Sequence, residues 1–292
     1  MITNRAPTLS LSGSTLAAQI RTQVATDAAD LTAAGTPPKL VVVTATLDES
    51  TAWYVRSIAK AASKAAIVCD ILDLGPDATG EQISRTLAAL SADDSVHGII
   101  LQTPLPPGVL AQDAAGAIST AKDVDGANPL SLGRLAAGLS AFAPATAEAV
   151  VRLLEFHGVE VSGRQVAVVG RSTVVGKPVA HLLLDRDATV TVCHSRTRDL
   201  PAVTSAADII VAAVGRPGLI TAEHVRPGAT IVDVGTNPTE DGGLTGDVDA
   251  ASVNGTAGAL SPVPGGVGPV TTALLLEHTV RAAQASAVAG NV

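Results

Sequence analysis

The hydrophobic and polar positions of this chain alternate between two patterns along its length. Short, nearly unbroken apolar runs rich in β-branched residues predict strands covered on both faces, as parallel strands are. Longer segments with helical spacing separate these runs. The runs lie at residues 40–44, 67–72, 98–101, 166–169, 189–193, 208–214 and 230–234, and the helical segments include residues 14–34 and 80–90. This order of elements predicts an α/β fold.

The most informative run is the one that ends at Gly170. Apolar residues 166–169 lead into this glycine, and a leucine-rich segment with helical spacing follows Gly176. The pattern predicts a strand, a tight turn and a helix, with glycines that permit a sharp bend and close packing. Free backbone N–H groups at the start of a helix favour a phosphate, so the turn predicts a dinucleotide. Ser172 replaces the middle glycine of the usual fingerprint, and an ordinary strand-to-helix turn is the alternative.

The segment after the next strand indicates which dinucleotide is bound. Residues 189–193 are followed by His-Ser-Arg-Thr-Arg, about where such folds contact the adenosine ribose. No Asp or Glu is present there to accept the ribose hydroxyls, as an NAD site would usually require. Arg196 or Arg198, together with Arg171, could instead bind a 2′-phosphate, which favours NADP. The alternative is that these arginines are ordinary solvated loop charges.

Two further loops are candidate cofactor contacts. The runs at 208–214 and 230–234 are each followed by a glycine, Gly215 and Gly235. In an open parallel sheet the ligand lies beyond the carboxyl ends of the strands. Residues 215–218 and 235–237 are therefore expected to line the same crevice.

Length, composition and charge narrow the class of protein. A chain of 292 residues favours two domains over one hydrophobic core. Its formal net charge of -8, without a cluster of Lys and Arg, argues against a nucleic-acid partner. It has no apolar run long enough to span a bilayer and no signal-like segment at its start, so we expect a cytoplasmic protein without a membrane partner.

Aromatic residues are scarce, and the single Trp and single Tyr are neighbours, Trp53 and Tyr54. They lie at the start of the helical segment that follows the strand at 40–44. A lone tyrosine just after a strand end is an unusual packing residue in an interior of Ala, Val and Leu, so Tyr54 is a candidate functional residue. The alternative is a tyrosine that covers its own helical turn with its hydroxyl in water.

Four motifs together resemble a known family. They are Ser-Pro-Val-Pro-Gly-Gly-Val-Gly-Pro-Val-Thr at 261–271, Asp-Val-Asp-Gly at 123–126, Gln-Thr-Pro-Leu-Pro at 102–106 and Gly-Arg-Ser at 170–172. In this order the chain resembles the methylenetetrahydrofolate dehydrogenase/cyclohydrolase family, the FolD proteins. The likeness covers nearly the whole chain, and the proline-glycine string is its most specific part.

The resemblance implies a homodimer whose subunits have two α/β domains with a cleft between them. Residues 1–145 plus 272–292 would form the folate-binding catalytic domain, and residues 146–271 a Rossmann-like domain that binds NADP. The substrates would be one-carbon derivatives of tetrahydrofolate. No metal is expected.

The resemblance also implies the site residues. Tyr54, Gln102 and Asp125 match family positions that line the folate site, where Asp125 would hold the pterin ring and Tyr54 would stack near the one-carbon bridge. Further expected contacts to folate are Pro264, Gly265 and Gly266. Expected contacts to NADP are Gly170, Arg171, Ser172, Gly176, Ser195, Arg196 and Thr236.

One position departs from the family pattern. The family has a lysine four residues after the tyrosine, one helical turn further on, and this chain has Ile58 there. Arg56 and Lys60 lie at steps of two and six from Tyr54 and point away from that face. Hydride transfer needs orientation more than a proton carrier, whereas hydrolysis needs one. We therefore expect a dehydrogenase whose cyclohydrolase activity is weak or lost.

Three alternatives stay open at this point. The chain could be a fully bifunctional dehydrogenase/cyclohydrolase, or a paralogue that binds folate or a nucleotide without catalysis. On fold analogy alone it could be an amino-acid or shikimate-type dehydrogenase, which the proline-glycine string disfavours. Reduction of NADP by methylenetetrahydrofolate would separate a dehydrogenase from both other classes.

Overall fold

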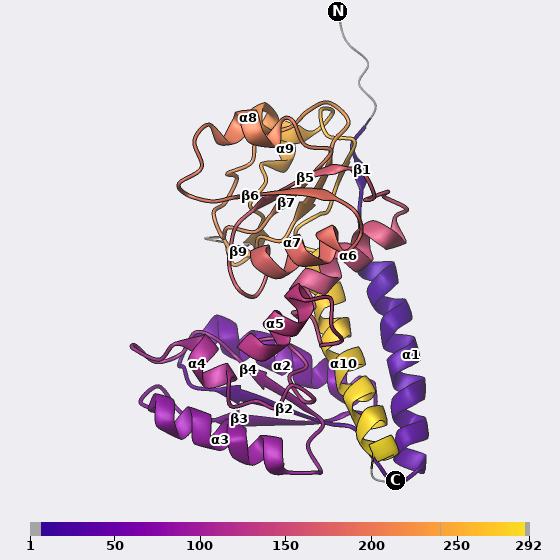
Figure 1. Cartoon of the computed structure of the whole chain (residues 1–292), viewed down its shortest axis with the longest axis vertical. Helices are drawn as coiled ribbons and strands as arrows, with labels where there is room; N and C mark the ends of the chain where they lie inside the picture. Colours follow the sequence, from indigo (N-terminus) through magenta and orange to yellow (C-terminus); the bar gives the residue numbers. More distant parts are fainter. Residues whose placement is uncertain (1–6, 240, 290–292) are drawn as a thin grey trace, which may run out of the picture. The chain divides into compact units, whose positions relative to one another are not determined.

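The computed structural model describes residues 7–239 and 241–289, which divide into two compact units. The six-stranded unit contains the described residues up to Ala17 and Thr146–Thr271, and the three-stranded unit contains Ala18–Ala145 and the described residues from Thr272 onward. Both units combine parallel sheets with helices (Figure 1). The prediction of two α/β domains, one of them Rossmann-like, is confirmed.

The sheet of the six-stranded unit is parallel at every pairing, in the order β1-β11-β8-β7-β5-β6. The direction of strand order reverses at β5, and in such sheets the ligand crevice lies at this point. β7 is fully buried, as its unbroken apolar run predicts. The strands are β1 (Leu9–Ser10), β5 (Gln165–Val169), β6 (Thr189–Cys193), β7 (Ile209–Ala212), β8 (Thr230–Asp233) and β11 (Ala259–Leu260).

Short helices and one hairpin complete the six-stranded unit. Helix α7 (Gly176–Leu184) packs against β5 and β6. The strands β9 (Asn237–Pro238) and β10 (Leu244–Thr245) form an antiparallel hairpin. The remaining helices are α6 (Ala145–Phe156), α8 (Leu200–Thr204), the 3-10 turn η1 (Ala222–His224) and α9 (Ala250–Val253).

The three-stranded unit has the strand order β3-β2-β4, again parallel. β2 (Lys39–Thr44) is the central and most buried strand, because its apolar run Leu-Val-Val-Val is covered on both faces. β3 (Val68–Asp73) and β4 (Gly98–Leu101) flank it, with α2 (Glu49–Lys64) against β3 and α3 (Gly80–Ala92) against β4. α4 (Ala111–Ala115) and α5 (Pro129–Ala136) follow.

Two long helices, α1 (Ser14–Ala33) and α10 (Val267–Ala289), begin in the six-stranded unit and continue in the other one. The start of α10 lies so close to residue 13 that a Cβ on Gly13 would lie 2.0 Å from the carbonyl oxygen of Gly266. Only glycine therefore fits at that position. Within the described residues, we find no helix whose length and apolar content would allow it to cross a membrane.

The described segment before Ala18 differs from the sequence-based domain division. The expectation placed residues 1–145 in the folate-binding domain, but β1 extends the six-stranded sheet. Leu9 N donates to Gly258 O at 2.9 Å, and Leu11 N donates to Leu260 O at 2.9 Å. A two-residue edge strand is too short to show a hydrophobic period, so the sequence carries no sign of this pairing.

Candidate functional site

The turn after β5 has the geometry that its glycines predict. Gly170 has φ +129°, and a Cβ there would lie 2.1 Å from Ala213 O. A Cβ on Gly176, the first residue of α7, would lie 2.2 Å from Gly170 O. Both positions therefore require glycine, which lets β5, the start of α7 and the end of β7 approach each other closely.

Ser172 changes this turn relative to the usual dinucleotide fingerprint. Its Oγ accepts hydrogen bonds from Val175 N at 3.1 Å and Gly176 N at 3.4 Å, so the hydroxyl caps the first turn of α7. Arg171 and Ser172 are exposed beside this helix start. The sequence predicts free N–H groups at this helix start, but Ser172 accepts from Val175 N, Gly176 N and Lys177 N. The exposed hydroxyl of Ser172 and the guanidinium of Arg171 are therefore the groups that fit a phosphate here.

The segment after β6 presents the other expected cations. Ser195, Arg196 and Arg198 are exposed, and Arg196 N donates to His194 Nδ1 at 3.1 Å. This bond fixes the backbone of the turn. The side chains of Arg196 and Arg198 are exposed and therefore accessible to a ligand. Exposed arginines next to the crevice edge fit a 2′-phosphate.

Asp247 joins the two loops that sequence analysis expects beside the cofactor. Its carboxylate accepts hydrogen bonds from Val214 N at 2.6 Å, Gly215 N at 3.0 Å and Arg216 N at 2.8 Å. It also accepts one from Asn237 Nδ2 at 3.0 Å. The loop after β7 and the loop after β8 are therefore held by one buried side chain.

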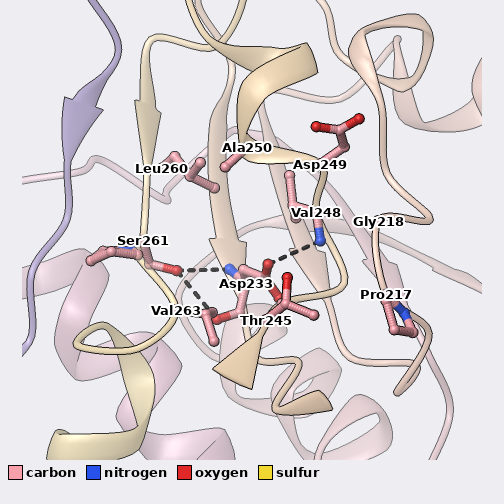
Figure 2. Close-up of a pocket in the computed structure, with 12 residues that line it drawn as sticks. Pro217, Gly218, Asp233, Thr245, Val248, Asp249, Ala250, Leu260, Ser261 and Val263 are labelled. Carbon is pink, nitrogen blue, oxygen red and sulfur yellow. Dashed lines mark hydrogen bonds between the residues drawn. The ribbon is translucent and has the colours of Figure 1, made fainter. Parts of the chain in front are cut away.

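Asp233, the last residue of β8, adds a second clamp. It accepts hydrogen bonds from the backbone N–H groups of Gly235, Asp247 and Val248, each at 2.9 Å. Burial raises the pKa of this carboxyl to about 6, although these hydrogen bonds act to lower it. Figure 2 shows the bond from Val248 and the two bonds that join Asp233 to the Ser261 hydroxyl.

A pocket of about 370 Å³ lies next to this clamp (Figure 2). Its walls come from the carboxyl ends of β8 and β11 and from the loops around them. Ser261, Pro262 and Val263 of the proline-glycine string contribute, while Pro264 is exposed and Gly265 has φ +107°. The other lining residues are Pro217, Gly218, Asp233, Thr245, Gly246, Val248, Asp249, Ala250 and Leu260.

The remaining cofactor and folate candidates of the six-stranded unit differ in exposure. Thr236 is exposed between the buried Gly235 and Asn237, so its side chain is available to a ligand. Gly266 is buried, and a Cβ there would lie 2.7 Å from Pro262 O. Gly266 therefore contributes through its backbone and the tight turn that it permits.

In the three-stranded unit, the structure brings Tyr54 and Asp125 together. Tyr54, on α2, is half-buried, and its pKa is raised to about 12, first by burial and then by the negative charge of Asp125. A hydrogen bond with the Thr272 side chain acts in the opposite direction. The Tyr54 hydroxyl is therefore neutral at physiological pH.

The carboxylate of Asp125 has few hydrogen bonds and favourable charges to offset its burial. Burial first, and then the charge of Asp123, raise its pKa to about 7. His278 and a hydrogen bond from the backbone of Ala145 oppose this rise. Near pH 7 the group is consequently balanced between its ionised and neutral forms.

The loop around Asp125 is fixed by its neighbours. Asp123 accepts hydrogen bonds from Ala127 N and Asn128 N, both at 2.9 Å. Asn128 caps α5 by accepting from Leu130 N at 2.7 Å. These bonds hold the turn that carries Asp125.

Gln102 and Ile58 occupy different environments. Gln102 directly follows β4 and is partly exposed, and its side-chain Nε2 donates to Thr103 O at 2.9 Å. Thr51, in the first turn of α2, makes a long 3.5 Å contact to the same carbonyl, so the Gln102 segment lies beside α2. Ile58 is 0% exposed and presents no polar group.

Sequence reasoning missed Asp233, Asp247 and His278. Asp233 could have been noted as a carboxylate at the end of a buried strand, two residues before a glycine. Asp247 and His278 are bound to groups far away in the sequence, and no local spacing marks them.

Comparison with known proteins agrees with this geometry. The family model for the catalytic domain of tetrahydrofolate dehydrogenase/cyclohydrolase matches residues 11–125, and that for its NAD(P)-binding domain matches residues 144–287. The chain is 62% identical over 279 residues to bifunctional protein FolD 1 of Saccharopolyspora erythraea, covering 96% of this chain and 95% of that protein.

Two solved structures share the fold. The bifunctional enzyme FolD of Campylobacter jejuni matches with a TM-score of 0.92 and 37% identity, covering 95% of this chain and 99% of that one. FolD of Trypanosoma brucei, solved with NADP cofactor and inhibitor, matches with a TM-score of 0.91 and 35% identity, covering 97% and 99%.

The fold and sites define a two-domain enzyme class with a folate-type catalytic domain and an NAD(P)-binding domain. The chain belongs to the tetrahydrofolate dehydrogenase/cyclohydrolase family, the FolD proteins.

Proposed function

We propose that this protein is an NADP-dependent methylenetetrahydrofolate dehydrogenase with weak or no cyclohydrolase activity. A C–H bond of the one-carbon bridge breaks, and its hydrogen leaves with the electron pair to NADP⁺. The product is methenyltetrahydrofolate, a cation delocalised over the two nitrogens that flank the carbon. Bound NADP⁺ supplies the hydride acceptor.

The six-stranded unit is assigned to NADP and the three-stranded unit to folate. The turn from Gly170 to Gly176 receives a phosphate, and Arg171, Arg196 or Arg198 receives the 2′-phosphate. In solution, the kcat/KM for NADP should exceed that for NAD, and Arg196→Gln should reduce this ratio by about tenfold. Ser195, Thr236 and Gly176 are the other expected contacts. An unchanged ratio would remove Arg196 from the 2′-phosphate site.

Tyr54, Gln102 and Asp125 orient the folate for hydride transfer. The ionised Asp125 can accept hydrogen bonds from the amino and ring N–H groups of the pterin. Tyr54 offers a ring face for stacking and a neutral hydroxyl. Pro264, Gly265 and Gly266 complete the predicted folate contacts. Because hydride transfer requires alignment and no proton carrier at this carbon, these groups suffice for the oxidation.

One observation carries the loss of hydrolysis, namely the aliphatic, fully buried Ile58 where the family resemblance expects a lysine. In hydrolysis, water forms a C–O bond to the methenyl carbon and loses a proton, and one C–N bond breaks as its nitrogen gains a proton. A positioned acid–base group typically contributes about 10²–10⁴-fold to such steps. Isoleucine has no atom that can hold the proton.

The test is a pair of rates on the purified protein, methylene oxidation with NADP⁺ and methenyl hydrolysis. We expect measurable oxidation and a hydrolysis rate about 10²–10⁴-fold below that of a lysine-bearing relative. Ile58→Lys should raise hydrolysis, because a lysine stem can lie in the apolar position while its amine reaches the polar edge. Ile58→Met is the matched control, since it has a long side chain without a proton carrier.

The outcomes separate the candidate functions. Oxidation with fast hydrolysis in the unmodified protein identifies a fully bifunctional enzyme. Binding of folate and NADP without either reaction identifies a non-catalytic paralogue. Oxidation rates of both variants serve as the internal standard for folding, so hydrolysis is compared as a ratio.

We also propose a homodimer, because the resemblance to FolD proteins implies one. Light scattering on the eluting protein should give the mass of two chains. The mass of a single chain across the working concentration range would contradict it.

A further inference from the structure

A histidine that sequence analysis did not consider lies beside the proposed folate carboxylate. His278, on α10, is 0% exposed. Its Nδ1 lies 2.8 Å from the carbonyl oxygen of Val124. Because a carbonyl oxygen only accepts, Nδ1 carries a proton and donates it, which fixes the orientation of the ring.

The position of this bond matters because Val124 separates Asp123 from Asp125. The imidazole is therefore anchored at the peptide between two carboxylates. The Phe142 ring packs against the imidazole, with ring centroids 5.0 Å apart and planes tilted by 37°. Arg281 lies 5.4 Å from the centre of the Phe142 ring. Packing and hydrogen bonding together leave the histidine little freedom.

The titratable groups around Asp125 lie on three parts of the chain. Tyr54 faces it from α2, Asp123 from its own loop and His278 from α10. Asp123 raises the pKa of Asp125, whereas His278 lowers the pKa of both carboxyls. Of these groups, His278 is the one that favours the ionised form of Asp125.

We propose that His278 is a positioning residue for folate binding. It fixes the turn from Asp123 to Asp125 through the Val124 carbonyl, and its imidazole beside this turn favours the ionised form of Asp125. The assignment rests on the proposed folate-binding role of Asp125. His278 acts through that carboxylate and not on the one-carbon unit itself.

Two substitutions separate its two contributions. His278→Asn keeps an N–H donor for the Val124 carbonyl but removes the ionisable imidazole. His278→Leu removes both. His224→Asn is the matched control, because His224 is also buried and hydrogen-bonded, to Thr221, but lies in the six-stranded unit.

The measurements are kcat and KM for methylenetetrahydrofolate from pH 6 to 9. In His278→Asn we expect the KM for the folate at pH 7 to rise about fivefold, with kcat and the KM for NADP within about twofold of the unmodified protein. Without the imidazole, which lowers the pKa of Asp125, that pKa rises, so the acid limb of kcat/KM should move to higher pH. His278→Leu should show a larger rise in KM, and His224→Asn none.

A second readout does not depend on catalysis. The carboxyl ¹³C resonance of Asp125, in protein labelled at aspartate, reports its titration directly. An upward displacement of this titration in His278→Asn supports the proposal. Unchanged titration and an unchanged pH profile overturn it. If the unmodified protein binds no folate, the proposed function fails, while the ¹³C titration still decides whether His278 controls the charge of Asp125.

Discussion

The six-stranded unit gives several hydrogen-bond donors to both aspartates of its pair, whereas the three-stranded unit gives them to Asp123 and leaves Asp125 with one backbone donor. In the six-stranded unit, Asp247 accepts hydrogen bonds from three backbone N–H groups and one side-chain amide, and Asp233 accepts three from the backbone. In the three-stranded unit, Asp125 accepts one backbone hydrogen bond, from Ala145, and has the charge of Asp123 beside it. One unit surrounds its carboxylates with donors, and the other leaves a carboxylate in need of them.

The difference separates a structural carboxylate from a ligand-binding one. Carboxylate oxygens that already accept several N–H groups hold loops in place and have little capacity for a ligand. Glycines make this possible, because a Cβ on Gly235 would lie 2.4 Å from Asp247 Oδ1. Asp125 keeps most of its acceptor capacity, so donors from a bound pterin would complete its environment.

The largest expected effect tests the structural side of this comparison. Asp247→Asn replaces a carboxylate oxygen by an NH₂ group that faces N–H donors such as those of Val214 and Gly215. Leaving buried donors unsatisfied costs about 1–3 kcal/mol each, so we expect a loss of about 3 kcal/mol in the free energy of unfolding of the six-stranded unit. The KM for NADP should rise as well, because the loops at Gly215 and Gly235 lose their common anchor. Urea unfolding and cofactor titration measure both effects.

Asp249→Asn is the control for this substitution. Asp249 is an exposed N-cap of α9, and asparagine caps a helix as well as aspartate does. Equal losses in the free energy of unfolding for Asp247→Asn and Asp249→Asn would show that the hydrogen bonds of Asp247 do not stabilise the unit more than an ordinary helix cap does.

The second prediction tests the ligand-binding side. Asp125→Asn should lower kcat/KM for methylenetetrahydrofolate by about 100-fold, because one acceptor of the pterin N–H groups becomes a donor. The protein should nevertheless stay folded, since the substitution removes a buried charge with few partners. Steady-state kinetics and thermal unfolding of the same preparation give both quantities. A loss of stability as large as that of Asp247→Asn would make Asp125 a structural residue.

The sequence predicted the elements better than it predicted these networks. Runs such as residues 166–169 and the glycine pair Gly170 and Gly176 have a local physical signature, and the structure has the corresponding strand, turn and helix. By contrast, His278 and its partner Val124 are 154 positions apart, and only the fold brings them together. The short strands β1 and β11 escaped notice for a related reason, because two residues define no period.

The candidate residues also differ in whether a local sequence signal marks them. Tyr54 and Asp125 were identified through motifs and do interact in the structure. The clamp by Asp233 and Asp247 depends on backbone N–H groups, which every non-proline residue carries and which sequence letters therefore do not distinguish. A motif indicates which side chain meets a ligand, whereas the network that holds a loop is a property of the folded chain.

The third prediction uses the pH dependence of stability. A folded-state pKa raised from 3.8 to about 7 means that folded Asp125 binds its proton more tightly than the unfolded chain does. This contribution to stability is complete below about pH 4 and is lost as the pH rises through 7. Asp125→Asn removes it, so the stability of the variant relative to the unmodified protein should increase between pH 4 and 7. We expect an increase on the order of 4 kcal/mol for this shift of about three pKa units, and a plateau above pH 7.

Asp233 supplies the contrast within this experiment. Its pKa is raised to about 6, so its contribution is lost at lower pH than that of Asp125. Unfolding curves collected at half-unit steps of pH distinguish the pH range in which the Asp233 contribution is lost from that of Asp125. A stability difference between Asp125→Asn and the unmodified protein that is constant from pH 4 to 8 would contradict the raised pKa of Asp125.

The smallest expected effect concerns a polar group in the six-stranded unit that is exposed, unlike the buried clamp. Ser172→Gly removes the hydroxyl that accepts from Val175 N and restores the glycine of the usual fingerprint. Water can satisfy the freed N–H groups, so the free energy of unfolding should fall by only about 0.5 kcal/mol. The KM for NADP should change by less than about threefold, because a phosphate that loses the hydroxyl can bind the backbone N–H groups that Ser172 no longer engages. If Ser172→Gly lowered the free energy of unfolding as much as Asp247→Asn, the unpaired N–H groups would cost as much in the exposed turn as in the buried loops held by Asp247. Burial would then not explain why the two units differ.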